Sequence, residues 1–355
     1  MSKRIYICHT FYHAYIACLK ELNLSEEERG NADLMLSTMS NDFGDLKTRA
    51  EKSGLFSAVY MYEEKEEKHF PQLTKYHKDR GNLLLNMFAR MRFTKLFGKL
   101  QAPFVPVNLK EYEDIYVFCD SDPIGYYLNR YKIPYHALED GLDCIRYYDT
   151  ARYDNRGHFE LKAWMASKNL IFIQNGYAKY CIDMEVNNIS VLPYPCPKYI
   201  EKPRKELTAN LSEDDKRALV SVFMDNLPKL EEQLALCPPD KKRALVLSEP
   251  LCDLEVRKQI FSDIIRDYCE DCVVLIKPHP RDVLDYTEIF PEHIVISGKF
   301  PMEILNFIPG LAFDKVISVF TVPDAIEFAG ETIFLGEDFM DKYEAPEIHR
   351  QNEAI

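Results

Sequence analysis

Short apolar runs alternate with helix-length segments along the whole chain. The segments predicted as strands are residues 4–8, 33–37, 58–62, 115–119, 135–138 and 170–174, followed by residues 244–247, 273–277, 294–297, 316–319 and 332–335. The segments predicted as helices are residues 12–22, 45–53, 80–99, 212–236, 254–268 and 323–329. Several of the strands are continuous apolar runs, which is typical of parallel strands buried on both faces. The alternation therefore predicts the α/β class, with doubly wound sheets.

Length and proline content predict two domains. The 355 residues suffice for two domains with separate cores. Pro193, Pro195 and Pro197 follow the sixth predicted strand, and prolines this dense end regular structure. We therefore expect an N-terminal domain at residues 1–197 and a C-terminal domain at residues 198–355, whose tail is polar. Because open α/β sheets bind ligands at the carboxyl ends of their strands, we expect the site residues there, in a cleft between the domains.

Charge and cysteine usage exclude several classes of protein. The net charge of −13 argues against a general nucleic-acid binder, because neutralising phosphates requires a basic surface. The ten cysteines form no disulfide framework and suit a reducing cytoplasm. No segment approaches the roughly 18 continuous apolar residues of a membrane span. The chain also lacks glycine-rich phosphate loops and a nucleophile elbow. We expect a cytoplasmic protein, in which the charged tract at residues 63–68 is a solvated loop.

The strongest candidate site follows the strand predicted at residues 273–277. His279 lies between Pro278 and Pro280, with Lys277 before them and Arg281 after them. The prolines fix the backbone, and three potentially cationic groups can form a pocket for a phosphate or carboxylate. A histidine can also protonate a departing phosphate oxygen. The weaker interpretation is a rigid turn with solvated basic side chains.

A second candidate follows the strand predicted at residues 135–138. Glu139, Asp140 and Gly141 continue the chain there. Paired carboxylates suit a general base that removes a proton from an acceptor hydroxyl, and the glycine permits a tight turn. An ordinary acidic β-turn explains these three residues equally well. Their pairing with the His279 motif in the other half of the chain favours the catalytic interpretation.

A third candidate follows the strand predicted at residues 316–319. Ser318 and Thr321 precede a helix that is expected to open at Pro323, and free amides at a helix N-terminus bind anions. Helix capping by Thr321 is the ordinary alternative. Further polar residues near strand ends are Ser248, Glu249, Asp253, His9, Thr10 and His13. Glu303 either accepts hydrogen bonds from a ribose or faces solvent.

These motifs together resemble the bacterial sialyltransferases of GT-B architecture. Residues 5–13, 247–251 and 276–282 are most similar to glycosyltransferase family 52, the lipooligosaccharide sialyltransferases, and the resemblance extends from about residue 5 to about residue 335. It implies two Rossmann-like domains that face each other across a cleft. The N-terminal domain would bind the acceptor, and the C-terminal domain would bind a CMP-sugar.

The resemblance also implies an activity and roles for the site residues. Sialic acid would pass from CMP-sialic acid to a hydroxyl of a cell-surface glycan, of lipooligosaccharide or capsule type, with inversion and without a metal or another cofactor. Besides His279, the residues expected to bind the donor are Lys277, Pro278, Pro280, Arg281, Glu303, Ser318, Thr321, Ser248 and Glu249. The residues expected near the acceptor or in the cleft are Glu139, Gly141, His9, Thr10 and His13. His279 would assist the departure of the phosphate. The base would be Asp140 or Asp253, and the resemblance leaves both open.

Other functions fit the same residues. One alternative is a GT-B transferase that uses another activated sugar, such as a polysialyl, Kdo or nucleotide-sugar donor. Another is a catalytically inactive relative that binds a glycan or a nucleotide. The family includes intertwined dimers, so the resemblance suggests a homodimer. The helix predicted at residues 80–99 mixes Arg and Lys with Leu and Phe, which makes it a candidate for peripheral contact with the inner face of the cytoplasmic membrane; packing on its own domain is the more ordinary interpretation.

Overall fold

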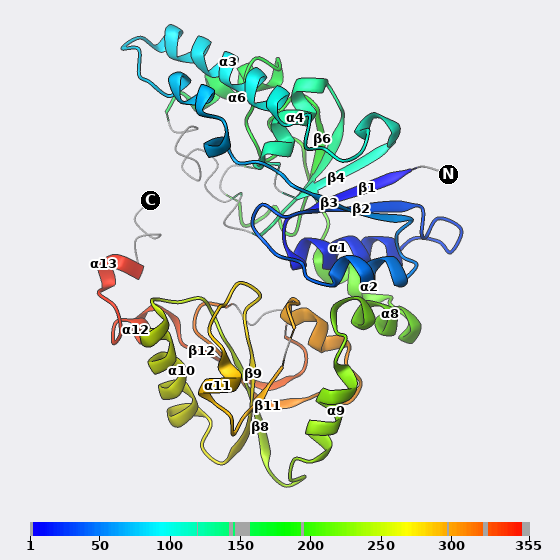
Figure 1. Ribbon diagram of the computed structural model, residues 1–355, viewed down its shortest axis with the longest axis vertical. Coiled ribbons are helices and arrows are strands. Elements are labelled where there is room, and N and C mark those ends of the chain that lie inside the picture. Colours follow the sequence, from blue (N-terminus) through cyan, green and yellow to red (C-terminus); the bar gives the residue numbers. More distant parts are fainter. Residues whose placement is uncertain are drawn as a thin grey trace. The chain divides into compact units, whose positions relative to one another are not determined.

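The chain divides into two compact units, Met1–Ser212 and Glu213–Ile355. The computed structural model describes residues 3–118, 120–141, 145, 157–192, 195–296, 298–321 and 326–349. Each unit is built around one sheet, and every strand pair in both sheets is parallel (Figure 1).

The first unit contains a seven-stranded sheet with the order β3-β2-β1-β4-β5-β6-β7. Its strands are β1 (Arg4–Cys8), β2 (Ala32–Ser37), β3 (Ala58–Tyr62), β4 (Asp114–Phe118), β5 (Tyr135–Leu138), β6 (Cys181–Val186) and β7 (Tyr199–Glu201). Every residue of β1 and β2 is buried, as expected of central parallel strands covered on both faces. The strand order reverses beside β1, and such a switch point brings loops from both halves of a sheet together at its carboxyl edge.

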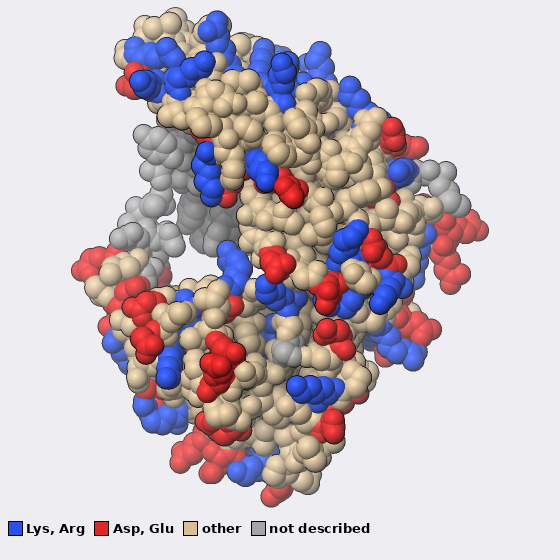
Figure 2. Space-filling model, in the orientation of Figure 1, with Lys and Arg blue, Asp and Glu red and all other residues tan. Residues whose placement is uncertain are grey.

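Helices and short 3₁₀ turns connect these strands. They are α1 (Phe11–Leu22), α2 (Leu46–Lys52), α3 (Leu83–Leu100), α4 (Pro123–Tyr131), α6 (Phe159–Ser167), α7 (Arg204–Ala209), η1 (Glu67–His69), η2 (Pro71–Tyr76) and η3 (Leu109–Glu111). Asn82 caps α3 by accepting from the amides of Leu84 and Leu85. A side chain at Gly98 would collide with the backbone of Tyr126, so this glycine allows α3 to pack closely against α4. Figure 2 shows Lys and Arg side chains gathered over the end of the unit that carries α3.

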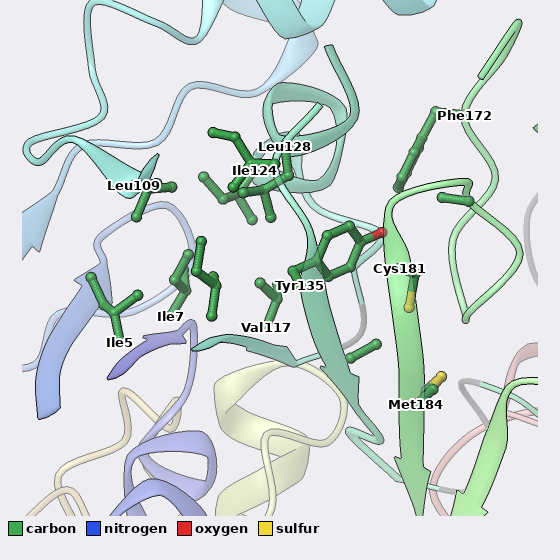
Figure 3. Close-up of a cluster of buried hydrophobic side chains, with 14 of the residues drawn as sticks. Ile5, Ile7, Leu109, Val117, Ile124, Leu128, Tyr135, Phe172, Cys181 and Met184 are labelled. Atoms are coloured by element: carbon green, nitrogen blue, oxygen red, sulfur yellow. The ribbon is translucent and has the colours of Figure 1, made fainter. Parts of the chain in front are cut away.

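One hydrophobic cluster of the first unit lies against one face of its sheet. Ile5 and Ile7 of β1 meet Val117 of β4 and Tyr135 of β5, and Leu128 of α4 covers them (Figure 3). These side chains are almost wholly buried. The packed sheet therefore provides a rigid base for the loops at its carboxyl edge.

The second unit contains a five-stranded sheet with the order β10-β9-β8-β11-β12. Its strands are β8 (Lys242–Leu247), β9 (Cys272–Lys277), β10 (Ile294–Val295), β11 (Phe313–Ser318) and β12 (Ala329–Phe334). Its helical segments are α8 (Glu213–Phe223), α9 (Leu227–Ala235), α10 (Leu254–Tyr268), α11 (Tyr286–Ile289), η5 (Met302–Phe307), α12 (Gly336–Met340) and α13 (Pro346–His349). Ile260, Phe261 and Ile264 pack α10 against the strands. The order of strands again reverses, beside β8.

The two doubly wound parallel sheets confirm the predicted fold class, while several element predictions were wrong. The apolar run at residues 170–174 is buried but irregular, because Asn169 and Asn175 on either side adopt left-handed backbone. The helix predicted at residues 212–236 is interrupted between α8 and α9, where Pro228 opens the second helix.

The structure also differs from the helix predicted at residues 323–329 and from the domain boundary predicted at residue 197. Of the helix predicted at residues 323–329, positions 323–325 lie outside the described residues, positions 326–328 are not helical, and Ala329 begins β12. Strand β7 pairs with β6, so the first unit continues past residue 197 to Ser212.

Candidate functional site

The loop after β9 holds His279 in one tautomer. The Nδ1 atom of His279 accepts a hydrogen bond from the backbone N–H of Arg281 at 3.1 Å, so the proton of the neutral ring resides on Nε2. Within the described part of the chain, no residue accepts a hydrogen bond from Nε2. Burial, together with the charges of Arg281 and Lys277, lowers the pKa of His279 to about 4. At neutral pH the ring is therefore an uncharged hydrogen-bond donor.

Lys277 lies below this loop and contributes charge to it. Its Nζ donates to the carbonyl oxygen of Pro278 at 2.8 Å and lies 4.1 Å from the centre of the Phe300 ring. Burial lowers its pKa to about 7, although the carboxylate of Glu303 opposes this shift. Burial also raises the pKa of Glu303. A bound anion would therefore readily favour the charged form of Lys277.

A network of buried polar side chains anchors the His279 loop. The carboxylate of Asp282, which is 0% exposed, accepts hydrogen bonds from Arg257 at 2.6 Å, Tyr286 at 2.8 Å and Ser248 at 3.1 Å. The same Ser248 hydroxyl accepts the backbone N–H of His279 at 3.1 Å. Ser248, predicted to bind the donor, thus links Asp282 to the loop backbone. Sequence reasoning missed Arg257 and Asp282; only Asp282 had a signal, its place in the Lys277–Asp282 motif.

Glu249 forms hydrogen bonds with the backbone amides that follow β11. Its carboxylate accepts the backbone N–H of Phe320 at 3.0 Å and that of Thr321 at 2.6 Å. The hydroxyl of Ser318 donates to the carbonyl oxygen of Thr321 at 2.8 Å. The sequence predicts Ser318 and Thr321 as phosphate ligands. In the structure, the Ser318 hydroxyl binds the Thr321 carbonyl oxygen, and the Thr321 amide binds Glu249.

Asp253 caps α10. Its side chain is exposed and accepts the backbone N–H of Val256 at 3.0 Å. This is the ordinary role of an aspartate before a helix. Arg257 donates hydrogen bonds to the carbonyl oxygens of Leu251 and Cys252 and so fixes the backbone that precedes Asp253.

In the first unit, His13 supports Asp140. The Nδ1 atom of His13 accepts the backbone N–H of His9 at 3.0 Å, so its Nε2 donates to the Asp140 carboxylate. The ring stacks on Phe118 at 4.2 Å between centroids. Burial lowers the pKa of His13, against the opposing effect of Asp140. His13 therefore orients the Asp140 carboxylate. The Asp140 side chain is 33% exposed, so solvent reaches part of it.

Glu64 and Asp122 keep His9 positively charged. The Nε2 atom of His9 lies 2.7 Å from Glu64 and 3.4 Å from Asp122. Burial opposes the charge, but the two carboxylates outweigh it and raise the pKa of His9 to about 9. Glu64 also accepts the Ser37 hydroxyl and the Ile124 amide, each at 2.7 Å. The prediction that residues 63–68 form a solvated loop was therefore wrong for Glu64, which is buried.

The predicted acidic pair separates into two roles. Glu139 is buried, and its carboxylate accepts the backbone N–H of Asn187 at 2.6 Å. Its own carbonyl oxygen accepts from Arg204 at 2.8 Å, a contact with no sequence signal. Gly141 has φ +120°, a conformation that favours glycine. Thr10, predicted near a cleft, caps α1 by accepting the amide of His13.

An open pocket within the first unit lies beside Asp122. Its volume is about 500 Å³, and Asp122 and Gln174 line it together with the aromatic side chains of Phe93, Phe97 and Tyr126. Aromatic faces beside polar groups can bind a sugar ring. Within the described residues, no group of three His, Cys, Asp or Glu side chains could hold a metal ion. No described helix is both long and apolar enough to cross a membrane.

Known proteins resemble this chain in sequence. The sequence pattern of glycosyltransferase family 52 matches residues 58–322. An uncharacterised protein of Haemophilus influenzae is 30% identical over 118 residues, which are 33% of this chain and 37% of that protein. The chain thus matches little more than a third of that relative's length.

Solved structures of sialyltransferases have a similar fold. The α/β-galactoside α-2,3-sialyltransferase of Photobacterium phosphoreum is 12% identical, with coverage of 93% of this chain and 90% of its own and a TM-score of 0.52. A sialyltransferase from Photobacterium damsela is 13% identical, with coverage of 93% and 73% and a TM-score of 0.51. The 2,6-sialyltransferase of Photobacterium sp. JT-ISH-224, in complex with CMP and lactose, is 14% identical, with coverage of 98% and 75% and a TM-score of 0.50. These likenesses confirm the expected GT-B fold.

Proposed function

The chain belongs to glycosyltransferase family 52, and we propose that it transfers sialic acid from CMP-sialic acid to a hydroxyl of a cell-surface glycan, of lipooligosaccharide or capsule type. The observation that carries this proposal is the fixed tautomer of His279, which presents Nε2–H at the basic end of β9. A neutral donor held beside Lys277 and Arg281 suits a phosphate that gains negative charge as it leaves.

The proposed reaction inverts the anomeric centre. The bond between the anomeric carbon of sialic acid and the CMP phosphate oxygen breaks, and its electron pair stays on that oxygen. His279 donates a hydrogen bond to the phosphate through Nε2, and the charged form of Lys277 adds positive potential. The acceptor oxygen attacks the opposite face of the same carbon, while a carboxylate removes the hydroxyl proton. We propose that no metal takes part, so a chelator leaves turnover unchanged.

We propose Asp140 as that base and the first unit as the acceptor side. Asp140 has a carboxylate that is open to solvent and oriented by His13, as a base needs. Asp253 already serves as the cap of α10. The aromatic pocket beside Asp122 supports sugar binding in the same unit.

The decisive experiment measures CMP release from CMP-sialic acid with lactose as acceptor, since a structurally similar sialyltransferase binds lactose. UDP-sugars serve as control donors. We expect turnover with CMP-sialic acid as donor and none with UDP-sugars. His279→Ala should lower this turnover at least about 100-fold, the usual scale of acid–base assistance. Turnover with UDP-sugars alone would assign another donor. CMP binding without turnover on any glycan offered would assign a binding protein, and full activity in His279→Ala would remove His279 from the mechanism.

A further inference from the structure

Helix α3 exposes an apolar and basic face. Leu84, Leu85 and Phe88 in its first half are 78%, 53% and 50% exposed. Arg92, Lys95 and Lys99 in its second half are exposed as well. Spacings of three and four residues place all six side chains on one side of the helix, and we call them the α3 surface.

The opposite side of α3 anchors the helix to the first unit. Phe93 and Phe97 are buried there and pack with Tyr126 of α4. Arg92 lies over the Phe88 ring at 4.5 Å, so the basic and apolar parts of the α3 surface are continuous. The helix therefore holds its outer face in a fixed position without covering it.

Apolar exposure continues on the neighbouring helix. Met87 and Met91 of α3 pack in one cluster with Met165 of α6, and the two helices lie beside each other (Figure 1). On α6, Trp164 is 55% exposed and Leu161 is 40% exposed. Exposed large apolar side chains grouped in this way mark an interaction surface.

Charge in this region is opposite to that of the whole chain. Residues 68–110 contain nine Lys and Arg residues but a single acidic residue, Asp79, whereas the chain carries a net charge of −13. The basic side chains gather over this end of the unit (Figure 2). The surface next to Leu84 and Phe88 is thus complementary to an anionic partner.

We propose that the α3 surface docks on a membrane that contains anionic lipids. Leu84, Leu85 and Phe88 would enter the boundary between headgroups and acyl chains, and Arg92, Lys95 and Lys99 would meet the anionic headgroups. If two α3 surfaces overlapped along their length about a two-fold axis, the basic half of each would face either the basic half or the apolar half of the other. A second copy of the chain therefore fits less well. This inference does not depend on the proposed function.

The test is cosedimentation of the full-length protein with vesicles of phosphatidylcholine alone or with about 30% phosphatidylglycerol, a composition that supplies the anionic surface. We expect binding to the anionic vesicles only, weakened by salt. Arg92→Glu/Lys95→Glu/Lys99→Glu should lower the partition coefficient at least about 10-fold, and Leu84→Ser/Phe88→Ser should lower it several-fold. All these positions are exposed, and circular dichroism checks that each variant folds.

Matched controls lie outside α3, in α7 and in the second unit. Lys205→Glu/Arg217→Glu/Lys258→Glu gives the same change in net charge at exposed sites, and Leu236→Ser/Val283→Ser removes apolar side chains that are at least as exposed as Leu84 and Phe88. Both should bind like the unaltered protein. Absence of binding to anionic vesicles, or an equal loss in the controls, would overturn the proposal. So would a concentration-dependent dimer that Leu84→Ser/Phe88→Ser abolishes, because a second copy would then cover this surface.

Discussion

The carboxylates of Asp140 and Asp253 differ in their hydrogen-bond partners. Asp253 accepts the Val256 amide and caps α10, whereas Asp140 accepts a hydrogen bond from the side chain of His13. We expect Asp140→Asn to reduce turnover by about 100-fold or more, because the amide cannot take the proton. Asp253→Asn should retain most activity, since asparagine caps a helix about as well as aspartate.

The same two variants provide their own control. CMP binding, measured by calorimetry, should be unchanged in both, because neither side chain is assigned to the donor. The reverse pattern, with turnover lost only in Asp253→Asn, would transfer the role of base to Asp253. Equal, full activity in both variants would remove both residues from proton transfer.

His9 links stability to pH. Its pKa is about 9 in the folded protein, above the ordinary value of 6.5, because Glu64 and Asp122 favour the charged ring. The folded state therefore binds an extra proton, which stabilises it fully below pH 6.5, and this stabilisation is lost as the pH rises through 9. Between pH 6 and pH 10 the free energy of unfolding should fall by about 3 kcal/mol on account of His9.

Urea denaturation of the unaltered protein and of His9→Gln measures this contribution. In His9→Gln, the free energy of unfolding should fall by about 3 kcal/mol less between pH 6 and pH 10 than in the unaltered protein. His69→Gln, at an exposed position, should not show this difference. Parallel curves for the unaltered protein and His9→Gln would mean that folding does not change the pKa of His9.

Single residues also show where the sequence is informative. The His279 loop could be predicted because two prolines, the histidine and its basic neighbours are adjacent in the chain. The environment of Glu64 could not be predicted, because its partners His9, Ser37 and Ile124 lie 55, 27 and 60 positions away. In the sequence, Glu64 looks like the solvated charges beside it. Only the fold distinguishes them.

At the scale of elements, α10 positions the His279 loop through one buried ion pair. Arg257 pairs with Asp282 at 2.6 Å, and both side chains are almost wholly buried. Removing one partner leaves the other charge buried, so Arg257→Met should lower the free energy of unfolding by about 3–5 kcal/mol. Because Asp282 also holds Ser248, and Ser248 holds the backbone of His279, CMP affinity should fall as well.

Arg266, on the same helix, provides the control. It pairs with Asp263 and Asp267 but is 65% exposed. Arg266→Met should therefore change stability by less than about 1 kcal/mol, as is usual for surface ion pairs. Chemical denaturation of both variants, with CMP binding measured on each, makes the comparison. Equal effects at the two positions would contradict the anchoring role of Arg257.

Elements were predicted well where apolar pattern alone determines them. Strands such as β1 and β9 are continuous apolar runs in both sequence and structure. Residues 170–174 have the same pattern, yet left-handed backbone at Asn169 and Asn175 prevents a strand. Asparagine adopts this conformation more readily than most residues, but nothing local requires it. Tertiary packing decides the outcome at such positions.

At the scale of the whole molecule, each unit provides a distinct set of groups. The His279 loop, with Lys277 and Arg281, belongs to Glu213–Ile355, and His13 with Asp140 belongs to Met1–Ser212. If the second unit alone binds the nucleotide, CMP should slow hydrogen exchange in residues 277–282 and leave residues 9–13 unchanged. At a CMP concentration of about 100 times the dissociation constant, binding should stabilise the folded second unit by roughly 2.7 kcal/mol. Amides that exchange only when this unit unfolds should then exchange about 100-fold more slowly.

Mass spectrometry of exchanging peptides, with and without CMP, measures both regions in one sample. UMP serves as the matched control, because it carries the same phosphate and ribose on a different base. Protection by CMP alone would indicate that the unit also reads the base, whereas equal protection would indicate recognition through phosphate and ribose. Protection confined to residues 9–13 would assign the nucleotide to the first unit, because a ligand slows exchange most where its contacts stabilise the fold.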